Sequence, residues 1–352
     1  MQPFMVRNLK VIAVTGSILL CTICSRAQNL ENPGEYMSAL SNAHVDMDKT
    51  YMAYTSAVAH SGKPRRIEKM RQQTLESIDK CRYKILDLPI YKKDDSLRQS
   101  NLKYVQLCYK VFNEDYAHIV NMEEIAEQSF DEMQAYLLLQ EKTDEKLKEA
   151  SDQLQKAAGS FASKYNVNLI ESKSELYDKM AIASRLNKYR NKIYLLFFKC
   201  NWQEAQITEA INQKKITGLE QSRNALITYA NEGLQVLDTL KHFDGDPGLS
   251  VACKNVLNFY KKTAEQDLVK ISDFFLKQEN FEKIKKAFDA KSESKRTQED
   301  VDAYNKAVND VNNAANNYNQ LNALLNSSRK SAMDNFENAE TQFADVHMPH
   351  YK

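Results

Sequence analysis

Residues 102–137 read LKYVQLCYKVFNEDYAHIVNMEEIAEQSFDEMQAYL, a stretch that contains neither proline nor glycine. Apolar residues recur along it in steps of three and four, at Leu102, Val105, Tyr109, Phe112, Tyr116, Ile119, Ala126, Phe130, Met133 and Leu137. This spacing keeps apolar side chains on one face of an α-helix, as in the seam of a helical bundle. We predict one unbroken helix from Ser96 to Gly159.

The same spacing is found near both ends of the chain. In the segment near the N-terminal end, the residues at this spacing are Met37, Leu40, His44, Met47, Tyr51, Tyr54 and Val58. In the segment near the C-terminal end, they are Val301, Tyr304, Val308, Val311, Ala315, Tyr318 and Leu325. Residues 193–198 (IYLLFF) are apolar all round, which indicates a buried helix. With 8 Gly and 6 Pro in 352 residues, the chain has too few turn residues for a strand-rich fold. We therefore predict an all-α protein, an elongated up-and-down bundle of about seven long helices.

The first 27 residues have the features of a cleaved signal peptide. Arg7 and Lys10 precede an uncharged apolar run from Val11 to Cys24, and small residues stand before Gln28. The run is shorter than the ~20 residues that span a bilayer, so a retained anchor is disfavoured. We expect residues 28–352 to be exported, without an integral membrane span, to the periplasm, to the outer membrane as an associated protein, or to the cell surface. They would form one helical domain, or two sub-bundles at about 28–165 and 166–352.

The charge of this exported part excludes the usual nucleic-acid-binding class. Without Arg7, Lys10 and Arg26, the 48 basic residues fall to 45, against 47 acidic ones. A nearly neutral chain lacks the basic surface that binds phosphates.

Four cysteines remain after signal removal, and an even number in an exported chain suggests disulfides. We predict the bridges Cys81–Cys108 and Cys200–Cys253, because each joins helices that are close in sequence and so usually neighbours in space. The alternative is four buried thiols.

Motifs for catalysis or cofactor binding are absent from the sequence. It contains no G-x-S-x-G, P-loop, G-x-G-x-x-G or H-E-x-x-H pattern, and Asp115-x-x-His118 is a single partial match to a di-iron motif. We predict no catalytic residue and no cofactor. The alternative is a bundle that holds haem or a metal through His44, His118, Glu123 or the C-terminal pair His347 and His350, in a tail that we expect to be frayed.

Two polar positions interrupt the apolar seams, namely His44 and Glu123. They would either be a buried ionisable cluster that holds a ligand or a satisfied polar pair that fixes the helix register. We favour the second interpretation.

An asparagine stripe runs along the last helix: Asn305, Asn309, Asn312, Asn316, Asn319 and Asn326. Asparagine is a poor helix former. The stripe could present its amides to a partner, either a protein or a polar glycan-like molecule. Alternatively it is a solvated face of low charge, and we favour this second interpretation.

Several stretches carry a family resemblance: residues 32–46 (NPGEYMSALSNAHVD), 131–140 (DEMQAYLLLQ), 197–202 (FFKCNW) and 257–262 (LNFYKK). In these the chain resembles a family of exported, all-helical bacterial surface proteins of Bacteroidota and spirochaete type, to which no activity is assigned. The resemblance implies export and a helical body, and it carries no catalytic residue to transfer. Our first hypothesis is a non-enzymatic binding or scaffold protein, the second is the cofactor-carrying bundle, and the third is a membrane-active helical protein.

Overall fold

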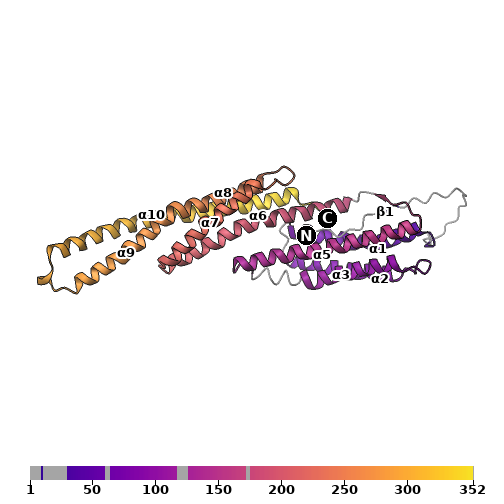
Figure 1. Ribbon diagram of the computed structural model, residues 1–352, viewed down its shortest axis with the longest axis horizontal. Coiled ribbons are helices and arrows are strands. Elements are labelled where there is room, and N and C mark those ends of the chain that lie inside the picture. Colours follow the sequence, from indigo (N-terminus) through magenta and orange to yellow (C-terminus); the bar gives the residue numbers. More distant parts are fainter. Residues whose placement is uncertain (1–8, 11–29, 60–63, 117–125, 172–174, 352) are drawn as a thin grey trace. The chain divides into compact units, whose positions relative to one another are not determined.

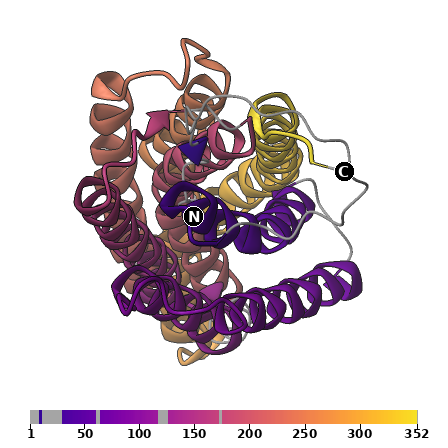
Figure 2. The same cartoon turned by 90° about the vertical axis from the view of Figure 1, so that its right-hand side faces the viewer.

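The computed structural model describes residues 9–10, 30–59, 64–116, 126–171 and 175–351. Figures 1 and 2 show that almost all of this part is helical. It divides into unit 1, residues 1–189 with 344–352, and unit 2, residues 190–343. The predicted boundary near residue 165 lies just after a helix, whereas the division falls inside the next one.

Unit 1 is a bundle in which neighbours in sequence also pack as neighbours, α1 on α2, α2 on α3 and α3 on α5. Its core lies between these helices and contains Tyr36, Tyr51, Phe112 and Tyr116, all nearly fully buried. Strands β1 and β2 form a minimal antiparallel pair. The elements are β1 (Leu9–Lys10), α1 (Pro33–Ala59), α2 (Pro64–Leu86), α3 (Ser96–Lys110), the π-helical segment η1 (Val111–Asp115), α5 (Phe130–Lys164), β2 (Ile170–Glu171) and the first part of α6 (Glu175–Asn212).

The predicted single helix from Ser96 to Gly159 is wrong, because a new helix begins at Phe130. Ser129 has extended backbone and its hydroxyl oxygen accepts from the backbone N–H of Glu132 at 3.1 Å. The same hydroxyl donates to the Glu132 carboxylate at 3.0 Å. Ser129-Phe-Asp-Glu132 is thus an S-x-x-E helix start, which satisfies backbone groups that would otherwise lack partners. The chain then returns as α5 and packs against α3.

Helices make up the regular secondary structure of unit 2 in its described residues. It contains the rest of α6, α7 (Ile216–Thr239), α8 (Gly248–Lys262), the π-helical segment η2 (Thr263–Asp267), α9 (Leu268–Asp289), the 3₁₀ turn η3 (Glu293–Lys295) and most of α10 (Gln298–His347). Since η1 prolongs α3 and η2 joins α8 to α9, the described chain forms eight long helical rods, close to the predicted seven. The prediction of an all-α up-and-down bundle is confirmed.

The two units repeat one local architecture at a constant separation in sequence. The helices α2 and α7 begin at residues 64 and 216, α3 and α8 at 96 and 248, and η1 and η2 at 111 and 263. Each pair of numbers differs by 152. The turns before α3 and α8 obey the same separation, since the β-bridge of Tyr91 with Asp94 corresponds to that of Phe243 with Asp246.

An arginine contact repeats with the same separation. Arg71 donates to the Glu68 carboxylate at 2.9 Å and to the carbonyl oxygen of Phe112, the second residue of η1, also at 2.9 Å. The counterparts in unit 2 are Arg223, Glu220 and Ala264, the second residue of η2, with N···O distances of 2.7 and 3.3 Å. In both units a guanidinium satisfies a carbonyl that the widened π-helical turn leaves open. We conclude that the units are two versions of one repeat.

Unit 2 carries an addition to this repeat. The ring of Tyr91 packs on Phe161, whereas that of its counterpart Phe243 packs on Phe343. Residues 161 and 343 differ by 182, so unit 2 has thirty more residues before its last aromatic contact. They lie in the hairpin of α9 and the first half of α10, residues 268–326, which we call the arm. Figure 1 shows the arm running past the turn between α6 and α7.

Aromatic pairs hold the two helices of the arm together. Tyr318 stacks on Phe274 with ring centroids 4.7 Å apart, and Tyr304 stacks on Phe288 at 4.6 Å. Near the tip, the Arg296 guanidinium lies 4.2 Å from the Phe288 ring centroid. Tyr304 and Tyr318 of the apolar seam predicted for the last helix therefore face α9.

Candidate functional site

Unit 1 contains a buried histidine whose partner lies on another helix. His44 of α1 is 0% exposed, and its Nε2 lies 2.8 Å from Oδ1 of Asn101 on α3. The Asn101 amide nitrogen donates to the carbonyl oxygen of Leu97 at 2.8 Å, so the amide oxygen is the atom that accepts from His44. Neutral His44 thus carries its proton on Nε2. Its Nδ1 has no hydrogen-bond partner among the described residues.

Burial controls the protonation of this histidine. It lowers the pKa of His44 from 6.5 to about 4, because the cation loses its hydration, although the hydrogen bond to Asn101 opposes the shift. The imidazole is therefore neutral at pH 7. This geometry is that of a polar contact that fixes α1 against α3. Glu123, the second polar seam position, and His118 lie outside the described residues.

Further polar groups are buried close to this pair. Burial raises the pKa of the Asp48 carboxyl, one helical turn after His44, and Oδ1 of Asp48 has no partner within the described chain. Asp48 interacts electrostatically with the thiols of Cys81 and Cys108 and with Tyr104. Across the described ranges, no cluster of three or more His, Cys, Asp or Glu side chains is arranged to hold a metal ion.

All four cysteines outside the expected signal are buried free thiols, so the predicted bridges are not present in this structure. Burial raises the pKa of Cys81 and of Cys200 to about 12 and also raises that of Cys108 and Cys253. Protonated thiols are weak nucleophiles and metal ligands. The two thiols of each predicted pair lie in the same unit and interact electrostatically. The disulfide pairing stays a prediction.

The asparagine stripe lies on the surface of the arm, on its α10 helix. All six of its residues are exposed, and the side-chain oxygen of Asn326 accepts from Arg329 at 2.7 Å. From Val311 to Ser328 the helix carries no charged residue. Each asparagine is about 0.5 kcal/mol less favourable in a helix than alanine or lysine, so the stripe costs about 3 kcal/mol of helix propensity.

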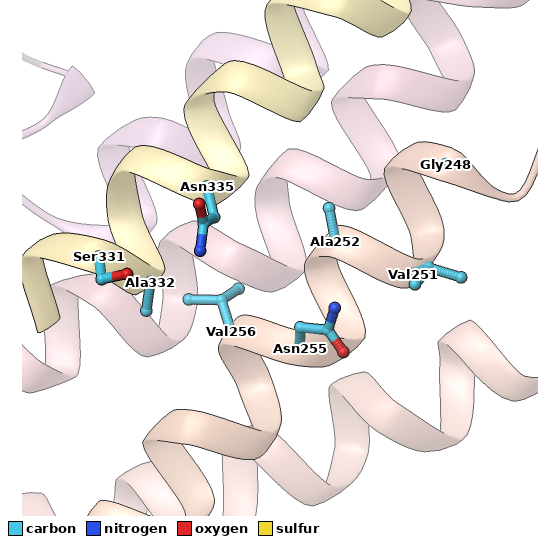
Figure 3. A pocket seen from close by; sticks show the side chains of 8 residues that line it. All are labelled: Gly248, Val251, Ala252, Asn255, Val256, Ser331, Ala332 and Asn335. Carbon is cyan, nitrogen blue, oxygen red and sulfur yellow. The ribbon is translucent and has the colours of Figure 1, made fainter. Parts of the chain in front are cut away.

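A shallow groove of about 450 Å³ lies between α8 and α10 in unit 2. Figure 3 shows Val256 and Asn335 directed toward each other from the two helices, with Ala252 and Ala332 beside them. The lining contains no charged side chain. The residue of unit 1 that corresponds to Val256 is Tyr104, and both are buried.

The C-terminal histidine pair lies at the end of a helix that continues to His347, not in a frayed tail. Met348 is 1% exposed, and the backbone N–H of Tyr351 donates to the Ser56 hydroxyl at 3.4 Å. These contacts anchor the chain end within unit 1. The expectation of a frayed tail is therefore wrong.

Comparisons of the chain with protein-family models, with curated proteins and with solved structures find no match. Among the described helices, none combines the length and apolar character needed to span a membrane.

Sequence reasoning missed several polar contacts that the structure shows. Asn101 was not singled out because its position relative to His44 depends on how α1 and α3 pack. In unit 2, Arg329 binds Glu204, which is only 7% exposed, from a distant part of the sequence. A usable signal existed only for Ser129, whose S-x-x-E pattern marks a helix start.

Proposed function

We propose that the chain is an exported, non-enzymatic helical-bundle protein of the periplasm or cell surface, which acts as a binding or scaffold module. The observation that carries this proposal is the asparagine stripe on the arm. It is an exposed, uncharged surface on a helical hairpin that is thirty residues longer than the corresponding stretch of the first repeat. A stripe with a cost in helix propensity and no role in the core is typical of a surface kept for recognition.

The N-terminal sequence supports the proposed export. Its basic, apolar and small-residue regions follow the order of a signal peptide, and the resemblance to exported surface proteins points the same way. The mature chain would begin at Gln28. Fractionation of the native host, with N-terminal sequencing of the envelope form, tests this part of the proposal.

Export also favours the two predicted disulfides. We propose that Cys81–Cys108 and Cys200–Cys253 form after export, since each pair belongs to one unit. Each bridge would stabilise the bundle by ~2–4 kcal/mol. Mass mapping of non-reduced peptides from the envelope form should show both bridges. Four free thiols would refute the pairing.

Site-specific photo-crosslinking in the native envelope tests the binding role. A photoreactive residue at Asn312 should give adducts of defined mass, whereas one at Gln153, exposed on α5 of unit 1, should give none. The absence of adducts from both positions, with the protein folded and exported, would contradict an interaction role for the stripe.

The cofactor-carrying bundle is the second candidate, and one observation favours it. The unpartnered Nδ1 of His44 is a buried lone pair of the kind that ligates metals. Visible absorption and metal analysis of the native protein test it, since stoichiometric haem or metal that is lost in His44→Leu would establish this candidate.

A further inference from the structure

We infer that the asparagine stripe is a self-association surface, and that its partner is a second copy of this chain. This inference rests on the proposed interaction role of the stripe and names the partner.

The spacing of the stripe is that of a coiled-coil seam. Successive members from Asn305 to Asn319 are separated by four, three, four and three residues, and Asn326 follows after seven. A repeat of 3.5 residues keeps a row in register with a partner helix over its whole length, which a merely solvated face does not require. At 1.5 Å per residue, the row is about 32 Å long.

The helix already uses a different seam within its own chain. Tyr304 and Tyr318 pack on α9, and Ala307 and Ala314 between them are buried. The asparagine stripe is a second row at heptad spacing on the same helix, and it is exposed. The helix α10 therefore has two rows at heptad spacing. The first packs on α9, and the second, the asparagine stripe, is exposed.

The chemistry of the stripe fits an identical copy. Each amide has both donors and acceptors, so two asparagine rows related by a two-fold axis complement each other without any second residue type. No charged residue lies between Val311 and Ser328, so over the four stripe members from Asn312 to Asn326 like charges do not oppose the approach of the copy. An asparagine in a coiled-coil seam fixes register and oligomeric state at a cost in stability. A dimer with amide pairs along its seam is therefore expected to be specific but weak and reversible.

Sedimentation equilibrium of the full chain, processed by its native host, tests the inference. We expect a reversible dimer in the micromolar range. The double variant Asn312→Lys with Asn319→Lys places charges on the seam and should raise the dissociation constant at least tenfold.

The matched control is Asn313→Lys with Gln320→Lys. It adds the same charges one residue away on the same helix, where both side chains are also exposed, and should change the dissociation constant less than twofold. A monomer at 100 µM, or equal weakening in both variants, would overturn the inference.

Cross-linking separates this inference from the broader proposal. A cysteine at Asn316, at the centre of the stripe, should give a covalent dimer on oxidation, because the centre lies near its own counterpart in parallel and antiparallel pairs alike. If the Asn312 photo-adducts contain a different protein and not a second copy, self-association is refuted while the interaction role remains. If no adduct forms, both are refuted.

Discussion

The buried His44–Asn101 pair makes the stability of unit 1 depend on pH in a predictable direction. The pKa of His44 is about 4 in the folded protein and 6.5 in the unfolded chain. Above pH 6.5 both states are neutral, and the stability of unit 1 is fully present. As the pH falls, the unfolded chain binds a proton that the folded chain does not, so the free energy of unfolding decreases until about pH 4.

The size of this effect follows from the shift. Each pKa unit corresponds to about 1.4 kcal/mol, so His44 should remove about 3 kcal/mol between pH 7 and pH 4, and about 2 kcal/mol of this by pH 5. In His44→Leu this contribution disappears. At pH 7 the variant should stay close to the wild type, because the unpaired Asn101 oxygen costs ~1–3 kcal/mol while the new apolar side chain and the loss of the unpaired Nδ1 offset that cost.

Hydrogen exchange of the α1 and α3 amides, corrected for intrinsic rates, measures the stability of unit 1 at pH 7 and pH 5. Between pH 7 and pH 5, the free energy of unfolding of unit 1 should decrease by about 2 kcal/mol more in the wild type than in His44→Leu. The control His242→Leu, at an exposed histidine of unit 2, should retain the wild-type pH dependence of unit 1. If wild type and His44→Leu lose stability in parallel between pH 7 and pH 5, the reasoning about His44 is wrong.

Substitutions at Ser129, at Arg71 and at two glycines test local features of the fold, each by the free energy of unfolding in urea. Ser129→Ala should cost about 1 kcal/mol because the start of α5 loses its cap, with Ser129→Thr much closer to wild type; an unchanged midpoint in Ser129→Ala would contradict the cap. Arg71→Met should lower the free energy of unfolding by about 2 kcal/mol, because the η1 carbonyl and the Glu68 carboxylate lose the guanidinium that donates to them. Faster amide exchange confined to η1 and α2 would support the assigned contact. Gly233→Val should lower the free energy of unfolding by ~1–3 kcal/mol, since a Cβ there would lie 2.7 Å from Leu257 Cδ1. A Cβ at Gly159 would meet no atom within 4 Å, so Gly159→Ala should raise the free energy of unfolding by up to about 1 kcal/mol. The opposite order of the two glycine variants would refute the packing.

Apolar spacing predicted the helices well because a seam is a local property of the sequence. Pro33 and Pro64 are the first residues of their helices, a position where the missing backbone N–H of proline costs no hydrogen bond. The break before Phe130 was missed because the apolar rhythm continues across it. The new helix begins there because Ser129 caps its first turn, and no proline or glycine marks the position.

The repeat of the two units was not visible in the sequence. Along the matched stretch the counterparts include identical pairs such as Glu68 with Glu220, but most positions differ in size and polarity. His44 and Asn101 show why, since Asn101 corresponds to Cys253 in unit 2. Packing preserves the backbone and its hydrogen bonds while the core side chains change together, so only the structure shows the correspondence.

The exposure of the asparagine stripe was predicted in outline but not its separation from the α9 contacts. The sequence places the stripe next to the apolar seam. Which face of the helix meets α9 depends on pairs such as Phe274 with Tyr318, which lie far apart along the chain. The sequence alone therefore favoured a solvated face over a recognition face, without showing which side of the helix meets α9.

Native mass spectrometry of the protein taken from its own cell envelope tests the central claim most directly. The account predicts a chain that begins at Gln28, is four hydrogens lighter than the reduced form because of two disulfides, and carries no prosthetic group. A chain that retains its first 27 residues, or one that carries stoichiometric haem or metal, would contradict an exported, non-enzymatic interaction protein.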